Sequence, residues 1–211
     1  MNTIQEVKDL AESILDQTIE DSLFIAVLNT MKNRREEMRA WQFLLKLKDT
    51  DSASTSPIAL PDDFRLPRKL LVGTGFQPYT PVRFDEQHLY RNSSNRYFLD
   101  MANNTYKLLG TAPTGTVYLY YLKTTPEIEE LTDVLTWPKR FWSILSYEIA
   151  GYIQSGVDAD DIFARMSPEN KGQALLLAQQ MENWDNQLQI ASQNGRVGVA
   201  DSEPEISIGN M

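Results

Sequence analysis

The stretch that divides this chain is residues 49–57, which have the sequence DTDSASTSP. It is made of small polar residues and ends in proline, a composition typical of loops. Residues 1–50 contain neither proline nor glycine, whereas seven prolines and four glycines fall between residues 57 and 126. We therefore expect the chain to change from helix to strand at this break.

Two helices are predicted before the break, within residues 1–48. Thr3 and Glu6 have the spacing of a capping box, and apolar residues then recur at intervals of three and four. A second start signal lies at Thr18, and the apolar stripe after it is interrupted by the charged run KNRREE at residues 32–37. We expect an antiparallel hairpin with this run on its solvated surface, unless its arginines meet an acidic partner.

A small antiparallel β domain is predicted over residues 49–126. Short runs of strand-forming residues alternate there with prolines and glycines, as in short strands joined by turns. In residues 117–122, apolar or aromatic side chains occupy both faces of the predicted strand, which indicates a strand covered on both sides. Asn103 and Asn104 predict a two-residue hairpin turn, because asparagine tolerates a positive φ. Either a sandwich or a partial barrel would accommodate these strands.

Helical signals return in residues 127–193. The Ser-Pro-Glu run at residues 167–169 supplies an N-cap, a proline at the first helical position and an acidic first turn. An Asn-Gly pair at residues 194–195 ends the last helix, and residues 194–211 are expected to form an extended tail. The fold class is therefore α+β: an α-helical bundle from the N- and C-terminal helices, with the small antiparallel β domain inserted between them.

The net charge of −9 is distributed unevenly. Residues 126–193 carry four Lys and Arg against eleven Asp and Glu, whereas residues 51–125 carry eight against six. An acidic chain does not bind phosphates by releasing counterions, so sequence-specific nucleic-acid binding is not expected. Acidity can serve solubility alone, or it can let DNA slide past without sticking.

Composition limits the compartment and the chemistry. The chain has no cysteine, which excludes disulfides, thiolate catalysis and sulfur-ligated metals. No apolar run approaches the roughly 20 residues that cross a bilayer, and the N-terminus lacks the basic and apolar regions of a secretory signal. We expect synthesis in a cytosol and no membrane partner.

No group of residues has the spacing of a catalytic, cofactor-binding or metal site. His88 is the single histidine and is expected in an exposed turn. Gly110 and Gly115 have the spacing of a phosphate-binding loop but lack its lysine, so they predict a hairpin turn. The acids at residues 158–161, with Glu169, approach calcium-loop spacing, but apolar residues occupy two required positions and helix capping explains them better. We predict a protein that is not an enzyme.

Aromatic residues outnumber the positions that the predicted apolar stripes require. Trp137 and Trp142 fall off the main stripe of their helix. Some of this surplus belongs to the core, but Trp and Tyr are also enriched in protein–protein interfaces. Trp137 and Trp142 are therefore candidate partner-binding residues.

Four short segments carry a resemblance to a known family: WQFLL (41–45), ALPDDFR (59–65), TP (125–126) and WPKRF (137–141). The first ends the N-terminal helices, the second opens the β domain, and the last two lead into the C-terminal helices. Over roughly residues 40–190, this order resembles that of the head-to-tail adaptor (connector or head-completion) proteins of tailed bacteriophages.

The resemblance implies a structural virion protein at the head–tail junction, made in the host cytoplasm. About a dozen copies would form a ring beneath the portal protein, extend the DNA channel and provide a platform for the next neck or tail protein. DNA would pass through without sequence-specific binding. In such proteins a terminal segment reaches toward the portal, which makes the following tail residues candidate portal-binding residues: Arg196, Val197, Val199, Ile206 and Ile208.

Two other functions stay open on the sequence alone. A stopper or a tail terminator would have the same organisation and differ in its partner. A small metal-dependent hydrolase would need clustered acids with a raised pKa or a bound metal.

Overall fold

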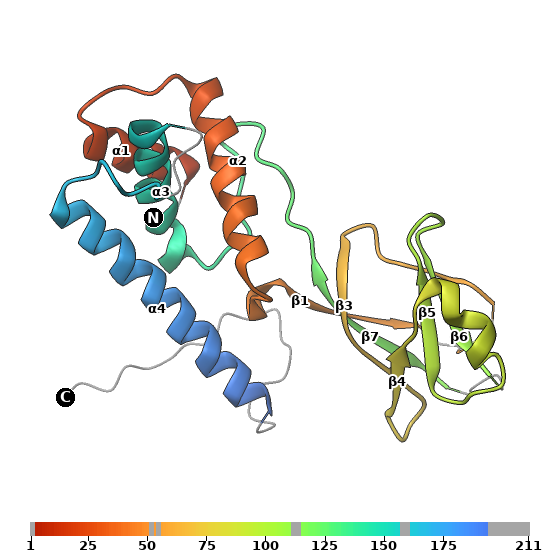
Figure 1. The fold of residues 1–211 in the computed structure, drawn as a ribbon. Coiled ribbons are helices and arrows are strands. Elements are labelled where there is room, and N and C mark those ends of the chain that lie inside the picture. The colour runs from red at the N-terminus through yellow and green to blue at the C-terminus, as the bar shows by residue number, and fades with distance from the viewer. Residues whose placement is uncertain (1–2, 51–52, 54–55, 111–114, 157–160, 194–211) are drawn as a thin grey trace. The chain divides into compact units, whose positions relative to one another are not determined.

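The computed structural model describes residues 3–50, 53, 56–110, 115–156 and 161–193. They form a mixed α/β protein whose chain divides into two compact units. The helical unit draws on the residues before Leu44 and after Thr125, and the β unit comprises residues 44–125 (Figure 1). Three short 3-10 helices accompany the longer elements: η1 (Gln42–Leu44), η2 (Phe84–Tyr90) and η3 (Lys139–Phe141).

In the helical unit, one helix packs against the other three. This central helix is α3 (Trp142–Ser155), and around it lie α1 (Ile4–Leu15), α2 (Asp21–Met38) and α4 (Pro168–Gln193) (Figure 1). The predicted hairpin is wrong in this respect, because α1 and α2 make their main contacts with α3 and not with each other. Buried residues occur around most of the circumference of α3, as expected for a helix enclosed by neighbours.

The helix ends largely follow the sequence signals. Thr3 Oγ1 accepts a hydrogen bond from the Glu6 backbone N–H at 3.2 Å, and Ser167 Oγ accepts one from the Asn170 N–H at 3.2 Å. Gly156 ends α3 with a φ of +88°. The predicted starts of α1 and α4 are therefore confirmed, since side-chain oxygens satisfy otherwise unpaired amides of the first turn.

The second helix is shorter than predicted, because tertiary hydrogen bonds turn the chain after Met38. Trp41 Nε1 donates to the Arg35 carbonyl at 2.7 Å, satisfying an oxygen in the last turn of α2. The Gln42 N–H donates to the Asp185 carboxylate of α4. Residues 45–48, predicted to be helical, form a strand, and the helical unit ends at residue 43 instead of residue 48.

The β unit is one curled seven-stranded sheet, a half-barrel, in the order β1-β7-β3-β4-β5-β6-β2 (Figure 1). Its strands are β1 (Leu45–Thr50), β2 (Ile58–Ala59), β3 (Phe64–Val72), β4 (Gln77–Pro81), β5 (Arg96–Asp100), β6 (Thr105–Leu109) and β7 (Val117–Lys123). The sheet is mixed, not antiparallel as predicted, because β4 and β5 pair in parallel. The connection through η2 makes this possible by returning the chain to the same end of the sheet.

The turn between β5 and β6 spans residues 101–104, so it is longer than the predicted two residues. Asp100 closes it by accepting hydrogen bonds from the backbone N–H of Asn103 at 3.2 Å and from its side-chain amide at 2.8 Å. Asn104 has a φ of +50°, the backbone conformation for which asparagine is suited.

The curl gives the sheet an inner and an outer face. Side chains from six strands and the neighbouring Leu60 pack on the inner face; they include Leu70, Val72, Tyr79, Tyr97, Tyr106, Leu108, Val117, Leu119 and Tyr121. The outer face of β7 carries Tyr118 and Tyr120, which are only half-buried. Leu122, the next position on this face, is 3% exposed, so the outer face of β7 is partly open at Tyr118 and Tyr120 and closed at Leu122.

Candidate interaction surfaces

His88 lies in η2 on the surface, as predicted. Its Nδ1 is 3.1 Å from the backbone oxygen of Asp85. It lines an open groove of about 830 Å³ with Phe84, Arg91 and Lys107. In the part of the chain that the structure describes, no carboxylate is hydrogen-bonded to the imidazole, the arrangement that orients a catalytic histidine.

The glycine pair Gly110 and Gly115 does not open a phosphate-binding loop. Gly115 leads into strand β7, whereas a phosphate-binding loop leads into a helix. Gly115 has a φ of +104°, and a Cβ there would lie 2.9 Å from Gly73 Cα, so a close backbone approach explains this glycine. Residues 111–114 lie outside the described residues.

In the acidic segment near residue 160, the prediction of helix capping is wrong for Asp161, which closes a turn. Asp161 accepts hydrogen bonds from Lys171 Nζ at 2.8 Å and from the Phe163 N–H at 2.9 Å, and these bonds lower its pKa. Residues 158–160 lie outside the described residues. Among the residues that are described, no three His, Asp or Glu side chains are placed to hold a metal ion.

The two tryptophans selected as partner-binding residues are buried. Trp137 is 3% and Trp142 is 1% exposed. Trp137 Nε1 donates to the Glu36 carboxylate at 2.7 Å, and Trp142 Nε1 donates to the Trp137 carbonyl at 2.9 Å. The ring of Phe43 packs on Trp137 with centroids 5.7 Å apart. Both indoles thus belong to the core of the helical unit, which encloses more of α3 than a single stripe.

The remaining candidate residues belong to the C-terminal tail and lie outside the described residues: Arg196, Val197, Val199, Ile206 and Ile208.

A stripe of buried charges on α2 escaped the sequence analysis. Lys32 is fully buried, and Arg35 and Glu36 are 5% and 3% exposed, although all three belong to the charged run assigned to solvent. Their positions in the sequence could have indicated this burial, because they lie at helical spacing from the buried residues Phe24 and Leu28 and share their face of α2. Charge alone was a misleading guide here.

Each of these buried charges has a partner. Lys32 Nζ donates to the Pro126 carbonyl, and Arg35 forms an ion pair with Glu148 of α3. Burial raises the pKa of Glu148, while the Arg35 guanidinium acts in the opposite direction. Glu36 accepts the indole hydrogen bond of Trp137. The charges therefore connect α2 to α3 and to the segments that precede α3.

A second buried carboxylate joins α4 to the end of α2. Asp185 is fully buried, and Arg39 lies 3.1 Å from its Oδ2 as an ion pair whose geometry is too oblique for a hydrogen bond. Its Oδ1 accepts the Gln42 N–H. Burial raises the pKa of Asp185, against the effects of the Gln42 hydrogen bond and the Arg39 charge.

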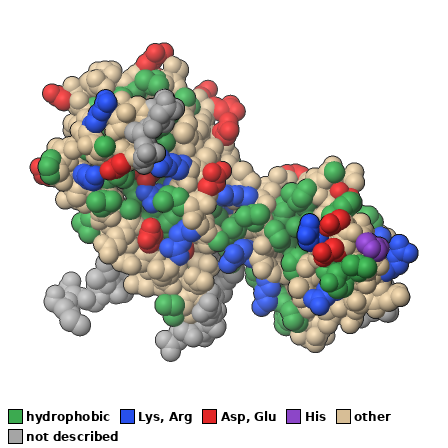
Figure 2. Space-filling model, in the orientation of Figure 1, with side chains coloured by type: hydrophobic (Ala, Val, Ile, Leu, Met, Phe, Trp, Pro, Cys, Tyr) green, Lys and Arg blue, Asp and Glu red, His purple; other side chains and the backbone are tan. Residues whose placement is uncertain are grey.

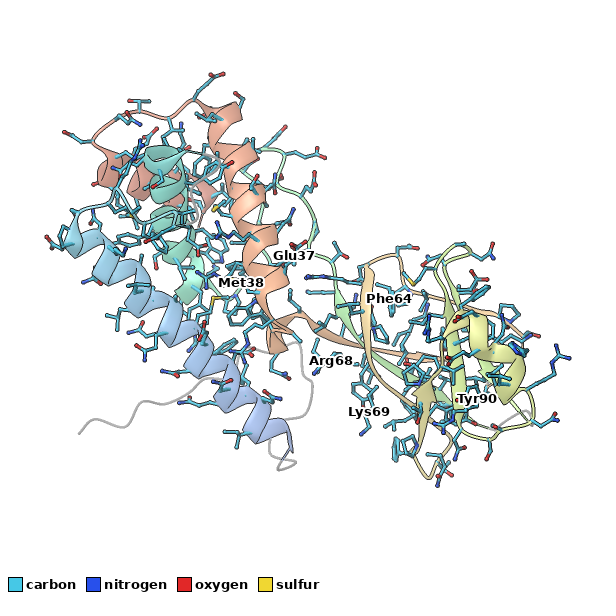
Figure 3. The ribbon with its side chains drawn as sticks, viewed as in Figure 1. Glu37, Met38, Phe64, Arg68, Lys69 and Tyr90 are labelled. Carbon is cyan, nitrogen blue, oxygen red and sulfur yellow. The ribbon has the colours of Figure 1, made fainter. Side chains whose placement is uncertain are left out.

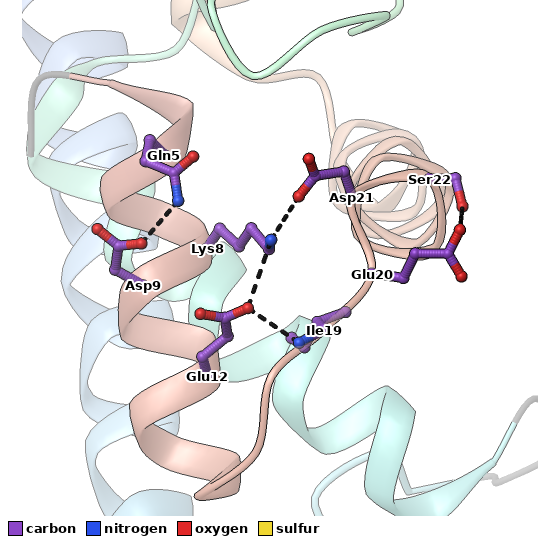
Figure 4. A network of polar contacts seen from close by, with 8 residues as sticks. All are labelled: Gln5, Lys8, Asp9, Glu12, Ile19, Glu20, Asp21 and Ser22. Carbon is purple, nitrogen blue, oxygen red and sulfur yellow. Dashed lines mark hydrogen bonds and ion pairs between the residues drawn. The ribbon is translucent and has the colours of Figure 1, made fainter.

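A polar network fixes α1 against the start of α2 (Figure 4). Lys8 Nζ donates to the Asp21 carboxylate and lies 3.4 Å from Glu12 Oε1. The same Glu12 oxygen accepts the Ile19 N–H at 2.9 Å. The hydrogen bond to Asp21 has the largest effect on the pKa of Lys8. It raises this pKa above its ordinary value, although burial acts in the opposite direction. This network holds structure in place and forms no open site.

In the β unit, Asp63 joins β1 to β7 at the rim of the sheet. It accepts hydrogen bonds from Tyr121 Oη at 2.8 Å and from Lys46 Nζ at 3.0 Å. Burial acts to raise the pKa of Asp63, but the two hydrogen bonds outweigh it and hold this pKa below its ordinary value. Burial and the bond to Asp63 raise the pKa of Tyr121.

The outer face of β1, β7 and β3 is rich in apolar and aromatic side chains. Strand register places Leu47, Tyr120 and Lys69 in one row, and the Phe76 ring contacts Tyr118 of the next row in a tilted arrangement, with centroids 5.2 Å apart. In Figure 3, Phe64 lies on the side of β3 that faces the core, and Lys69 projects from the opposite side. We call this surface the outer sheet face; its members are Leu47, Asp49, Leu66, Lys69, Phe76, Tyr118 and Tyr120.

Three members of the outer sheet face are exposed apolar residues. Leu47 is 37%, Leu66 52% and Phe76 54% exposed. Figure 2 shows hydrophobic side chains at the surface of the β unit beside basic ones. Exposed apolar groups that adjoin one another, unlike scattered ones, are typical of a surface that binds another protein.

The outer face of α4 is poor in charge and combines three exposed apolar side chains with uncharged amides. Leu175 is 52%, Leu176 47% and Ile190 58% exposed. In the described residues 172–191, Glu182 is the one charged side chain that reaches solvent, since Asp185 is buried. We call this surface the outer face of α4; its members are Leu175, Leu176, Gln179, Gln180, Glu182, Asn183, Gln187 and Ile190.

The chain matches no protein-family model, and no curated protein matches it. In the described residues, no helix is both long and apolar enough to cross a lipid bilayer. Among the described residues, the outer sheet face and the outer face of α4 are the candidate interaction surfaces on which the proposal below is built.

Proposed function

We propose that this chain is a structural subunit of the head-to-tail adaptor ring of a tailed bacteriophage. One observation carries the proposal: each unit has its own uncovered, charge-poor surface, namely the outer sheet face and the outer face of α4. Depletion of charge and exposure of aromatic and aliphatic groups are the compositional marks of protein interfaces. A subunit of a ring needs two different contact surfaces, one for each neighbour.

Two further features support this function. The order of segments over residues 40–190 resembles that of adaptor proteins, and in that family the terminal helices form a bundle that bears the β domain. The acidic balance of the chain is compatible with a channel through which DNA slides without binding. In this proposal about a dozen copies lie beneath the portal and present a platform to the next neck or tail protein.

The test is capture of the portal protein by the full chain and by a variant lacking residues 196–211. We expect the full chain to retain portal in a tagged pull-down analysed by mass spectrometry, and the deletion variant to lose it. Circular dichroism checks that both proteins keep the same fold. Equal capture by a folded deletion variant would contradict the role assigned to the tail.

The pull-down also separates the alternatives. Recovery of tail proteins without portal would indicate a stopper or a tail terminator. Recovery of neither, together with strong thermal stabilisation by a divalent metal, would favour a metal-dependent hydrolase and overturn the proposal.

A further inference from the structure

The outer sheet face and the outer face of α4 match in size. β7 has seven residues, which at about 3.3 Å per residue give a strand of roughly 23 Å. Leu175 and Ile190 are fifteen residues apart on α4, which at about 1.5 Å per residue is roughly 22 Å. A helix laid on a sheet is one of the stable ways to bury two apolar faces.

The two surfaces also match in chemistry. The outer sheet face offers tyrosine hydroxyls at Tyr118 and Tyr120, the cation Lys69 and, opposite Tyr118, the exposed carboxylate of Asp49. The outer face of α4 offers glutamine and asparagine amides and one anion, Glu182. Apolar side chains lie beside the polar groups on both surfaces. Hydrogen bonds and one ion pair would therefore form among apolar contacts.

Net charge distinguishes the possible contacts between two copies of the chain. Residues 44–125 carry ten Lys and Arg against seven Asp and Glu, whereas the rest of the chain carries ten against twenty-two. Contact between two helical units therefore brings together like charge, and so does contact between two β units. Contact between the β unit of one copy and the helical unit of another brings together opposite charge.

We propose that the outer face of α4 of one copy docks on the outer sheet face of the next copy. The contact is heterologous, because it joins two different surfaces, and repetition of such a contact closes into a ring or continues as a filament. This inference rests on the proposed adaptor function, which it deepens by naming the surfaces that join neighbours. An interface of standard size buries about 800 Å² on each partner.

The absence of cysteine from the sequence allows a direct test. Two single-cysteine proteins are made, Lys69→Cys and Leu176→Cys, both at exposed positions. They are oxidised separately and as an equal mixture, free and after capture on portal. We expect a cross-linked dimer in the mixture, at least tenfold more abundant than in either protein alone. Asn92→Cys, also exposed but on the connection before β5, is the matched control and should not cross-link to Leu176→Cys.

Each other outcome overturns the inference. Dimers formed by Lys69→Cys alone or by Leu176→Cys alone would show symmetric contacts. A rapid cross-link within a dilute double variant carrying both cysteines would show that α4 covers the sheet of its own chain. No cross-link in the free or the portal-bound mixture would show that the two surfaces do not meet.

The inference and the proposed function fail separately. Portal capture without the mixed cross-link would leave the adaptor function standing and remove this inference. A mixed cross-link without portal capture would leave the contact standing and remove the adaptor function. Adding Leu175→Asp to the Leu176→Cys protein sharpens the first result, since it should lower the mixed cross-link at least tenfold while circular dichroism stays unchanged.

Discussion

The two units of this protein are held together in different ways. In the helical unit, charged side chains of α2 lie in the core and are paired, as in the Arg35–Glu148 ion pair. In the β unit, the core contains apolar and aromatic side chains, and its clearest ion pair, Lys46–Asp63, lies at the rim. A buried charge depends on its partner far more than a rim charge does, because solvent cannot replace the partner.

The largest effect that separates the two units is expected at Arg35. Replacing it as Arg35→Leu leaves the Glu148 carboxylate buried without its cation, which should cost about 3–5 kcal/mol of unfolding free energy. Urea denaturation measures it. The neighbouring exposed residue supplies the control, because Arg34→Leu should change stability by no more than about 0.5 kcal/mol. Similar small losses in both variants would show that Arg35 is solvated.

The cost of Arg35→Leu should also depend on pH. Burial raises the pKa of Glu148, and removing the Arg35 cation raises it further. A group that binds its proton more tightly in the folded state loses stability as pH rises above its unfolded pKa. The difference between wild type and variant should therefore be larger at pH 7 than at pH 4. Denaturation curves at both pH values measure it, and a difference independent of pH would argue against a buried carboxylate.

A smaller effect tests the packing of α3 as the central helix. A Cβ at Gly151 would lie 2.5 Å from the Ile162 carbonyl oxygen, so Gly151→Ala should destabilise the protein by about 1–3 kcal/mol. Gly172 of α4 has no atom within 4 Å of such a Cβ, and Gly172→Ala should stabilise by about 0.5–1 kcal/mol. Thermal unfolding of both variants measures the pair. Equal changes of the same sign would contradict the close approach at Gly151.

The smallest effect is expected at the rim of the β unit. Asp63→Asn weakens the hydrogen bonds to Lys46 and Tyr121 and should cost about 0.5–1.5 kcal/mol at pH 7. The pKa of Asp63 lies below its ordinary value, so the ionised group contributes stability above pH 4 and loses it as pH falls through the folded-state pKa. The advantage of wild type should thus shrink below about pH 4 in urea denaturation. A loss as large as that of Arg35→Leu would remove the contrast between rim and core.

The sequence predicted correctly those helix ends that are formed by interactions between residues close to one another in the chain. The caps at Thr3 and Ser167 involve atoms within a few residues, so their spacing in the sequence was informative. The end of α2 was mispredicted because its partner, Asp185, lies 143 residues away. The parallel pairing of β4 with β5 likewise depends on the route of the chain through η2.

Much of the candidate site could not be predicted. Trp137 and Trp142 were selected because they lie off an apolar stripe. Trp142 is buried because it begins α3, which is enclosed on most sides, whereas Trp137 precedes η3 and is buried against Glu36 and Phe43. The exposure of Leu66 and Phe76 could not be predicted either, because alternation along a strand does not say which face another layer will cover. The aromatic residues on both faces of β7 were the available signal, and they were interpreted as a strand with two covers.

The sequence by itself determined the overall order of a helical, a β and a second helical region and the uneven charge, because each depends on neighbouring residues or on composition. The tertiary structure alone decided that α3 is the central helix, that Lys32, Arg35 and Glu36 are buried, and that the sheet and α4 each leave a face uncovered. The physical reason is that burial is a property of pairs of surfaces. The chemistry of a side chain sets the free-energy penalty of burying it, but the hydrogen-bonding or charged partner that offsets this penalty comes from a distant part of the chain.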